Sequence, residues 1–282
     1  MITDLIPVAI LGCQRSGTTL TGQWLGAAPG AALIDEPDRL YPWAEAALAG
    51  DHKAPELFRQ VCAKARSKYV DPDARFTANG EEAAEPAPGV THLVLKAPNL
   101  TYAYSAMQAD ASDWRFIYLI RDPRAVVSSM AGLSHIPMVD NQARWIRKYP
   151  DIAARYADEL AGMEDESLPM HVRRALVWKV KSDLWTAFAD RFPRKTARRI
   201  RYEDLVLDQA GARDAMAEVS GLELPPPEGA AAYFQGLGPG RTQRDRPADA
   251  ASLETWRRHL SETEAAEVLE MAGELASAHD YA

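Results

Sequence analysis

Short apolar runs alternate along the chain with longer stretches in which apolar residues recur every three or four positions. The short runs have the length of strands buried on both faces, whereas the longer stretches have the period of amphipathic helices. Strands are expected near residues 8–12, 93–96, 116–120 and 198–202. Helices are expected over residues 17–27, 41–68, 123–131, 139–161, 171–190, 209–220 and 261–277. This alternation predicts an α/β fold with a parallel sheet and helices on both faces.

The first strand leads into a glycine-containing loop. Gly12 and Gly17 follow the apolar run Val8–Leu11 and bracket four residues, which is the Walker A spacing. A loop of this kind, followed by a helix, directs backbone N–H groups and the positive end of the helix dipole at an anion. Nucleoside triphosphatases place lysine directly after the second glycine. Here that position is Thr18, and the cation of the loop is Arg15. We therefore expect phosphate binding without ATP hydrolysis.

A second strand–turn–helix segment carries another candidate anion ligand. Phe116–Ile120 is expected to be a strand, after which Asp122 is suited to cap a helix and Pro123 to its first position. Arg121 then lies at the carboxyl end of a strand, where open α/β sheets bind ligands. Ser129 follows two turns into the helix. An arginine fork and a hydroxyl together suit a terminal phosphate.

These two segments resemble the donor-binding motifs of sulfotransferases that use 3′-phosphoadenylyl sulfate (PAPS). Residues 14–20 are similar to their 5′-phosphosulfate loop, and residues 121–129 to their 3′-phosphate motif. The resemblance implies a P-loop-type parallel sheet, PAPS as donor, 3′,5′-adenosine bisphosphate (PAP) as product and no metal. It also implies that the 5′-phosphosulfate is held by Arg15, Ser16, Gly17, Thr18 and Thr19, and the 3′-phosphate by Arg121 and Ser129.

The same resemblance suggests catalytic groups. Lys96 ends a predicted strand, and the family has a lysine there that stabilises charge on the transferring group. Many aryl and steroid sulfotransferases carry a histidine base two residues later, but this chain has Pro98. Glu36 matches the catalytic glutamate of the tyrosylprotein-type branch by its distance from the loop arginine, with Asp35 as the competing carboxylate. A general base of this kind contributes roughly 10²–10⁴-fold.

Later segments resemble further donor contacts. Residues 197–206 are similar to the strand-to-helix segment in which a family tyrosine touches the adenine, which makes Tyr202 the candidate here. Residues 240–247 resemble the late basic loop of the family, where Thr242, Arg244 and Arg246 are all candidates. Their spacing does not decide among them.

Composition narrows the possible functions. The chain has 282 residues, 47% of them hydrophobic, and a net charge of −8. This charge argues against nucleic-acid binding, and the basic stretch 171–201 is expected to be an amphipathic helix with a cationic face. Two cysteines give neither a disulfide framework nor a zinc site. No apolar run approaches the roughly 20 residues of a membrane span. Because the first strand follows Met1 almost at once, we expect a cytoplasmic protein without a targeting segment.

The leading hypothesis is transfer of a sulfuryl group from PAPS to a hydroxyl of a small metabolite, with a tyrosyl peptide or a sugar as alternative acceptors. A nucleotide kinase or phosphotransferase and a non-catalytic nucleotide-binding module are the alternatives of other classes. We expect one domain over residues 1–282, because the motifs for one ligand span most of the chain. The helical excursions at 37–90 and 132–175 are expected to form the acceptor pocket, with a loop over 71–89. The sequence leaves the acceptor and the oligomeric state open.

Overall fold

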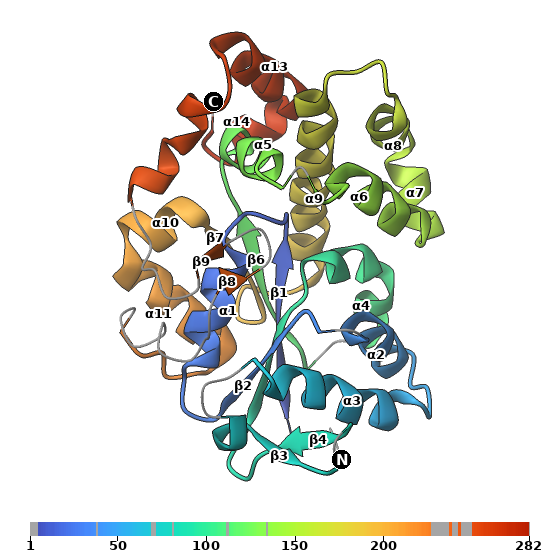
Figure 1. Ribbon diagram of the computed structural model, residues 1–282, viewed down its shortest axis with the longest axis vertical. Helices are drawn as coiled ribbons and strands as arrows, with labels where there is room; N and C mark the ends of the chain where they lie inside the picture. Colours follow the sequence, from blue (N-terminus) through green and yellow to red (C-terminus); the bar gives the residue numbers. More distant parts are fainter. Residues whose placement is uncertain are drawn as a thin grey trace.

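In the computed structural model, five parallel strands form the central sheet in the order β2–β5–β1–β6–β7 (Figure 1). Their bounds are β1 Ile6–Gly12, β2 Ala31–Asp35, β5 His92–Lys96, β6 Arg115–Ile120 and β7 Ala197–Arg201. The structure describes residues 5–37, 39–68, 72–80, 82–110, 113–133, 135–226, 237–238, 242–243 and 250–281. The predicted parallel α/β sheet is confirmed.

The edge strand β2 was not predicted. Its sequence, Ala31–Asp35, opens with two alanines, which have low strand propensity, so the local pattern does not distinguish it from a turn. All five of its residues are nevertheless buried, and it pairs in parallel with β5. Tertiary packing therefore determines this strand.

Two short antiparallel pairs lie outside the central sheet. The strands β3 (Phe76–Ala78) and β4 (Ala84–Pro86) form a hairpin, so the prediction of a plain loop over 71–89 is wrong for these residues. Strands of three residues are too short to show a period of two in the sequence. The other pair is β8 (Leu237–Gly238) with β9 (Thr242–Gln243).

The helices follow the predicted amphipathic stretches, with additional breaks. The α-helices are α1 Thr18–Gly26, α2 Leu40–Leu48, α3 Ala54–Arg66, α4 Tyr104–Asp110, α5 Pro123–Ala131, α6 Met138–Arg147, α7 Pro150–Arg155, α8 Ala157–Glu164, α9 Met170–Arg191, α10 Tyr202–Leu207, α11 Gln209–Ser220, α13 Glu262–Ala272 and α14 Glu274–Ala278. The 3₁₀ turns are η2 Pro72–Ala74, η3 Pro98–Ala103, η6 Ala250–Leu253 and η7 Thr255–Arg258. The boundaries predicted for α5 and α11 are confirmed.

Three predicted helices are divided in the structure. The stretch 41–68 breaks after α2, where Gly50 has a φ of +64°, and the stretch 261–277 breaks at Gly273, with a φ of +58°. The stretch 139–161 becomes α6, α7 and α8, with a first break before Pro150. Proline disfavours helical geometry in the residue that precedes it, and a positive φ ends a helix.

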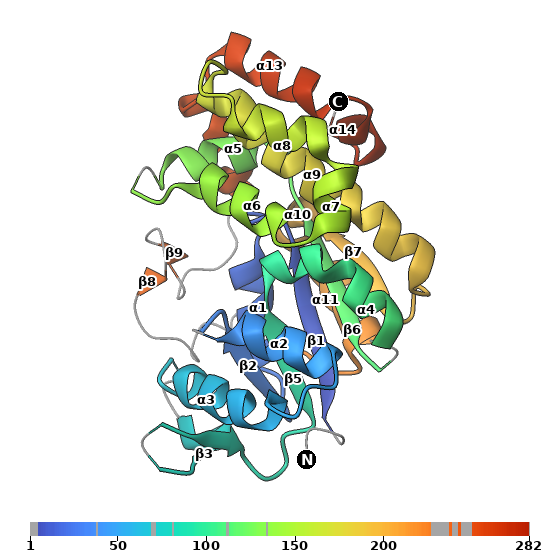
Figure 2. The same ribbon diagram turned by 90° about the vertical axis from the view of Figure 1, so that its right-hand side faces the viewer.

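The helices cover both faces of the sheet. Helix α1 packs on β2, β5 and β1, and α11 packs on β6 and β7. Helix α9 and turn η3 lie on the opposite face, while α5, α6, α8 and α13 pack around α9 beyond the carboxyl ends of the strands (Figure 1). Figure 2 shows these helices at one end of the molecule and α2, α3 and the β3 hairpin at the other.

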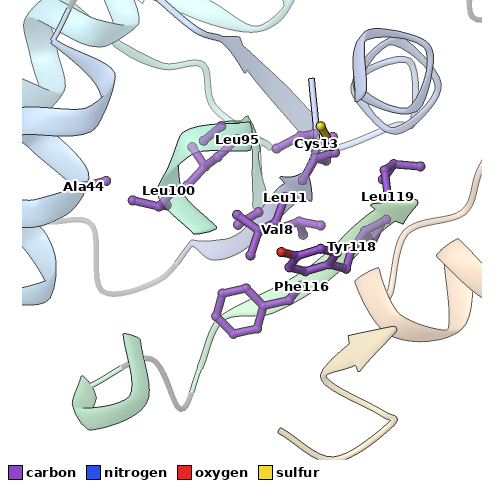
Figure 3. Packing of buried hydrophobic residues seen from close by; sticks show 14 of the residues in the cluster. Val8, Leu11, Cys13, Ala44, Leu95, Leu100, Phe116, Tyr118 and Leu119 are labelled. Atoms are coloured by element: carbon purple, nitrogen blue, oxygen red, sulfur yellow. The ribbon is translucent and has the colours of Figure 1, made fainter. Parts of the chain in front are cut away.

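Aromatic side chains join the sheet to α9. Phe116 and Tyr118 share one face of β6, because residues two apart in a strand point the same way. Each ring lies 5.5 Å from the ring of Phe188 in α9, measured between centroids. Leu11 is in register with Tyr118 and belongs to the same buried layer (Figure 3). This layer holds α9 against the sheet, next to the loop that follows β1.

Candidate active site

The candidate site residues lie at the carboxyl ends of five neighbouring strands. Glu36 follows β2, Lys96 ends β5, Arg15 belongs to the loop after β1, Arg121 follows β6 and Tyr202 follows β7. The chain leaves β1 toward β2 and later continues on the other side with β6, so the strand order reverses beside β1. Open α/β sheets bind ligands at such a switch point.

The two glycines of the loop meet distinct steric demands. Gly12 has a φ of +113°, and a Cβ there would lie 2.1 Å from the carbonyl oxygen of Leu119. Gly17 has a φ of +91° and precedes α1, and a Cβ there would lie 2.6 Å from Cδ2 of Tyr202. Only glycine satisfies both the positive φ and the close approach. The loop is thereby held against β6 on one side and Tyr202 on the other.

The loop ends in a site suited to an anion. Helix α1 starts at Thr18, and the first N–H groups of a helix have no acceptor within it. The Ser16 hydroxyl is fully buried and has no hydrogen-bond partner among the described residues. Thr18 is buried, and Thr19 is partly exposed. A buried hydroxyl without a described partner, beside the first amides of a helix, fits an oxyanion ligand.

Two arginines and a serine from separate motifs meet beside this loop. The Nε of Arg15 donates to the hydroxyl of Ser129 at 2.9 Å. Arg121 donates from Nη1 to the carbonyl oxygen of Arg15 at 3.0 Å. Burial lowers the pKa of Arg15, and the positive charge of Arg121 lowers it further. Two cations held close together in a poorly solvated place favour a bound anion.

Arg121 is also fixed to Tyr202 and to a late segment of the chain. Its guanidinium carbon lies 4.0 Å from the ring centroid of Tyr202, and Nη2 donates to the carbonyl oxygen of Ser252 at 3.0 Å. The hydroxyls of Tyr202 and Ser252 are 2.9 Å apart. Arg121 follows β6 directly, where Asp122 caps α5 by accepting from the amide of Arg124 at 2.8 Å, as predicted.

Lys96 lies between two carboxylates. Its Nζ contacts the carboxylate of Glu36 and lies 3.2 Å from Oδ1 of Asp35. Burial by itself lowers the pKa of Lys96, but the two carboxylates outweigh it and the pKa is raised. Lys68, two residues after α3, donates to the carbonyl oxygen of Asp35. Asp35 thus has two cationic neighbours and is 5% exposed.

Glu36 differs from Asp35 in its surroundings. The side chain of Glu36 is 29% exposed, and Oε1 accepts from the hydroxyl of Tyr41 at 2.7 Å. Glu36 has a φ of +42° and Arg15 a φ of +72°, a conformation that few non-glycine residues of the described chain adopt. Such strain clusters at functional sites. Because its side chain is 29% exposed whereas Asp35 is 5% exposed, Glu36 is the more accessible carboxylate of the pair.

A model of the sulfotransferase family matches residues 7–226, well over half of the chain. The chain belongs to this family.

Solved structures share the fold of this chain. The sulfotransferase is similar to the sulfotransferase domain of the olefin synthase from Synechococcus PCC 7002, with a TM-score of 0.59 and 14% identity over 99% of this chain and 96% of that chain. It is also similar to the sulfotransferase domain from the curacin biosynthetic pathway, with a TM-score of 0.58 and 13% identity over 99% and 98% of the two chains. No match was found among curated proteins.

The family assignment confirms the predicted family, the predicted fold class and an enzymatic function. The hypotheses of a nucleotide kinase and of a non-catalytic module have no such support. None of the helices in the described part of the sulfotransferase combines the length and apolar character needed to cross a membrane. Within those same residues, no three His, Cys, Asp or Glu side chains gather in a way that could hold a metal ion.

Some predicted residues lie outside the described structure, and two residues that contact predicted site residues or their loop were not predicted from the sequence. Arg244 and Arg246 lie outside the described residues, and Thr242 is described only as part of β9. Ser252 was missed because nothing in its local sequence marks it. Lys181 was also missed, because a lysine in a helix is ordinarily solvated. The predicted cationic face of α9 does not include Lys181, which is fully buried.

Proposed function

We propose that this sulfotransferase moves the sulfuryl group of PAPS to the hydroxyl of a small molecule. The observation that carries the proposal is the arrangement around β1. The two arginines Arg15 and Arg121, with the Ser129 hydroxyl, lie on one side, and the contact between Glu36 and Lys96 lies on the other. A donor with two anionic groups and a hydroxyl acceptor need these two kinds of site next to each other.

The donor would be held by loop and arginines together. The buried Ser16 hydroxyl, the first amides of α1, Thr18, Thr19 and Arg15 would bind the 5′-phosphosulfate, with Gly17 allowing the close approach. Arg121 and Ser129 would bind the 3′-phosphate, and Tyr202 would contact the adenine. We assign the late-loop candidates Thr242, Arg244 and Arg246 to the same nucleotide. All of these belong to a single domain in this proposal.

The chemistry follows from the groups at the ends of β2 and β5. The acceptor oxygen forms a bond to sulfur while the bond from sulfur to the phosphate oxygen breaks, and its electron pair leaves with PAP. The proton of the acceptor hydroxyl passes to a carboxylate oxygen of Glu36. Lys96 and Arg15 stabilise the negative charge that builds on the transferring group and on the leaving oxygen. Preorganised cations and N–H donors carry out the charge stabilisation, and we assign no metal ion to this step.

The acceptor is a small hydroxylated metabolite in this proposal, with a tyrosyl peptide or a sugar as alternatives. Pro98 stands where many aryl and steroid enzymes of the family have a histidine base, and Glu36 supplies the base in its place. We assign the acceptor pocket to the segments 37–90 and 132–175, since Tyr41 of the first contacts Glu36 and its ring lies 4.7 Å from that of Trp145 in the second.

Calorimetric titration with PAP, with ADP and with ATP–Mg²⁺ in parallel tests the donor assignment. We expect micromolar binding of PAP but not of ADP or ATP–Mg²⁺, because only PAP carries a 3′-phosphate for Arg121 and Ser129. Incubation with PAPS and a panel of phenols, alcohols, sugars and a tyrosyl peptide then identifies the acceptor by the mass of a sulfuryl group. Preference for ATP–Mg²⁺ over PAP would overturn the proposal and favour a kinase.

A further inference from the structure

Helix α9 places a fully buried lysine in contact with the loop after β1. We call this loop, residues 12–17, the donor loop because the proposed function assigns PAPS to it. Lys181 is 0% exposed, and its Nζ lies 4.9 Å from the ring centroid of Tyr102. Among the described residues, the hydrogen-bond acceptors of Nζ are all uncharged oxygen atoms, whereas Lys96 contacts two carboxylates. Burying an ammonium without a carboxylate partner is costly. Simple packing would favour an apolar side chain here.

The four oxygens belong to two segments on either side of Lys181. Nζ donates to Oε1 of Gln14 at 2.8 Å and contacts the carbonyl oxygen of Gly12 at 3.4 Å, both in the donor loop. It also donates to Oδ1 of Asn99 at 2.8 Å and to the carbonyl oxygen of Pro98 at 3.0 Å, at the start of η3. Lys181 therefore joins the loop that contains Arg15 to the segment that follows Lys96.

The second segment leads on to the proposed base. The Gln14 side chain donates to Asn99 directly. The backbone N–H of Asn99 donates to the hydroxyl of Tyr41 at 3.4 Å, and that hydroxyl donates to Oε1 of Glu36 at 2.7 Å. A continuous set of hydrogen bonds thus runs from the donor loop through Lys181 and Asn99 to Glu36. Networks of this kind hold their members in a single arrangement when all are satisfied.

We infer that Lys181 is a positioning residue that fixes the distance and orientation between the donor loop and the base Glu36. This inference rests on the proposed function, since it assigns the donor to the loop and proton transfer to Glu36. Lys181 itself touches neither reactant in this proposal. It acts through Gln14 on one side and through Asn99 and Tyr41 on the other.

The variant Lys181→Met tests this role, with Lys179→Met as the matched control on the same helix. Methionine keeps the length of the side chain and removes the charge and the hydrogen bonds. Lys179 is partly exposed and pairs with Glu159 at 3.1 Å, and within the described chain no hydrogen bond or ion pair joins it to the loop. We expect kcat of Lys181→Met to fall on the order of 100-fold, the loss that a displacement of about 1 Å causes. PAP affinity should change far less, and Lys179→Met should behave as wild type.

A purely structural lysine would give a different result. In that case Lys181→Met would have a lower Tm, but at a temperature where it is fully folded its kcat would equal that of wild type, which would overturn the inference. Asn99→Ala provides a second test that removes one acceptor and no charge. Its kcat should also fall. The double variant Lys181→Met/Asn99→Ala should be no slower than Lys181→Met, because the effects of substitutions within one network are not additive. Additive losses would contradict a shared network.

The pH profile gives an independent readout. Burial lowers the pKa of Lys181 to about 7. The ammonium has three N–H donors for the surrounding oxygens, whereas the neutral amine has two, so kcat should decline as pH rises through this range. The titratable groups that face Lys181 are Cys13, Tyr102, Tyr118 and Glu36.

The first three of these groups do not explain such a decline. Burial raises the pKa of the Cys13 thiol to about 12 and raises those of Tyr102 and Tyr118. Glu36 is present in both proteins, so a comparison of wild type with Lys181→Met removes its effect. The decline should be absent from Lys181→Met, and an identical decline in both proteins would exclude Lys181 as its source.

The outcomes separate this inference from the proposed function. If wild type neither binds PAP nor transfers a sulfuryl group from PAPS, the proposed function fails. If wild type does both and Lys181→Met retains the wild-type kcat and pH profile, only the positioning role fails.

Discussion

Arg121 and Tyr202 form one unit at the ends of two neighbouring strands. The guanidinium carbon of Arg121 lies 4.0 Å from the centroid of the Tyr202 ring, and both residues contact Ser252. The strands β6 and β7 that precede them pair in parallel, with Ile120 in register with Arg201. The orientation of the arginine fork is therefore set by the sheet, by an aromatic ring and by a late segment together.

Replacing Arg121 with lysine should weaken PAP binding although the charge is kept. A lysine lacks the planar fork and stacks less well on an aromatic ring. Loss of a charged hydrogen bond is worth about 1.5–3 kcal/mol, so calorimetry should show a Kd about ten- to a hundredfold higher. Arg115→Lys is the control, because Arg115 begins the same strand at its opposite end and donates to the carbonyl oxygens of Asp113 and Trp114. Equal Kd values for Arg121→Lys and wild type would refute the 3′-phosphate assignment.

Glu36→Gln and Asp35→Asn should separate the base from its neighbour. We expect Glu36→Gln to lower kcat by about 10²–10⁴-fold, the contribution of a general base, with PAP affinity nearly intact. Asp35 is more buried and interacts with both Lys96 and Lys68. Asp35→Asn should therefore lower Tm more than Glu36→Gln does, and should lower kcat less. Turnover against pH and thermal unfolding measure the two effects. A larger kcat loss in Asp35→Asn would assign the base to Asp35.

The sequence was sufficient to predict where in the fold the residues of the two strand–loop–helix motifs lie. Gly12, Gly17, Arg15 and Arg121 each follow directly from a strand that the apolar pattern identifies, and parallel strands bring their carboxyl ends to one edge of a sheet. Ser252 contacts Arg121 across 131 residues, and no local pattern encodes such a contact.

Lys181 is a different kind of omission, because its position did carry a signal. It is spaced from Val177, Leu184 and Phe188 so that all four share one face of α9, and this face is buried. A lysine on the apolar stripe of a helix indicates a buried partner. The residue type alone suggested that Lys181 is solvent-exposed, whereas its position in the helical period of apolar residues indicated that it is buried. Which oxygens it binds could not be predicted, since they come from loops far apart in the sequence.

Gly12→Ala should destabilise the fold and not merely the site. The new Cβ would lie 2.1 Å from a backbone oxygen of β6 at a φ of +113°, so strand or loop must shift. We expect the free energy of unfolding to fall by about 3 kcal/mol, combining overpacking with backbone strain. Gly80→Ala is the matched control, because Gly80 has a φ of +86° but open space around it. It should lose only the strain of about 1–2 kcal/mol. Equal losses in urea unfolding would argue against the close contact with β6.

The buried His279 should make the protein less stable in mild acid. Burial and the neighbouring positive charge of Arg199 lower its pKa to about 4, and its Nδ1 accepts from Nη1 of Arg199 at 2.7 Å. The unfolded chain has the ordinary pKa of about 6.5, so between these two values it binds more protons than the folded protein does. Stability from the neutral ring is therefore fully present above about pH 6.5 and is lost as pH falls to about 4. The total is on the order of 3 kcal/mol.

His279→Gln should remove this part of the pH dependence, because glutamine keeps an acceptor for Arg199 and does not titrate. The measurement is urea unfolding of both proteins at several pH values between 7.5 and 4.5, comparing the slopes of the free energy of unfolding with pH. Carboxylates contribute equally to both slopes, so their difference belongs to His279. His52→Gln is the control, since that side chain is 88% exposed and should leave the slope as in wild type. Parallel slopes for His279→Gln and wild type would mean that His279 accepts a proton in the folded state as readily as in the unfolded chain.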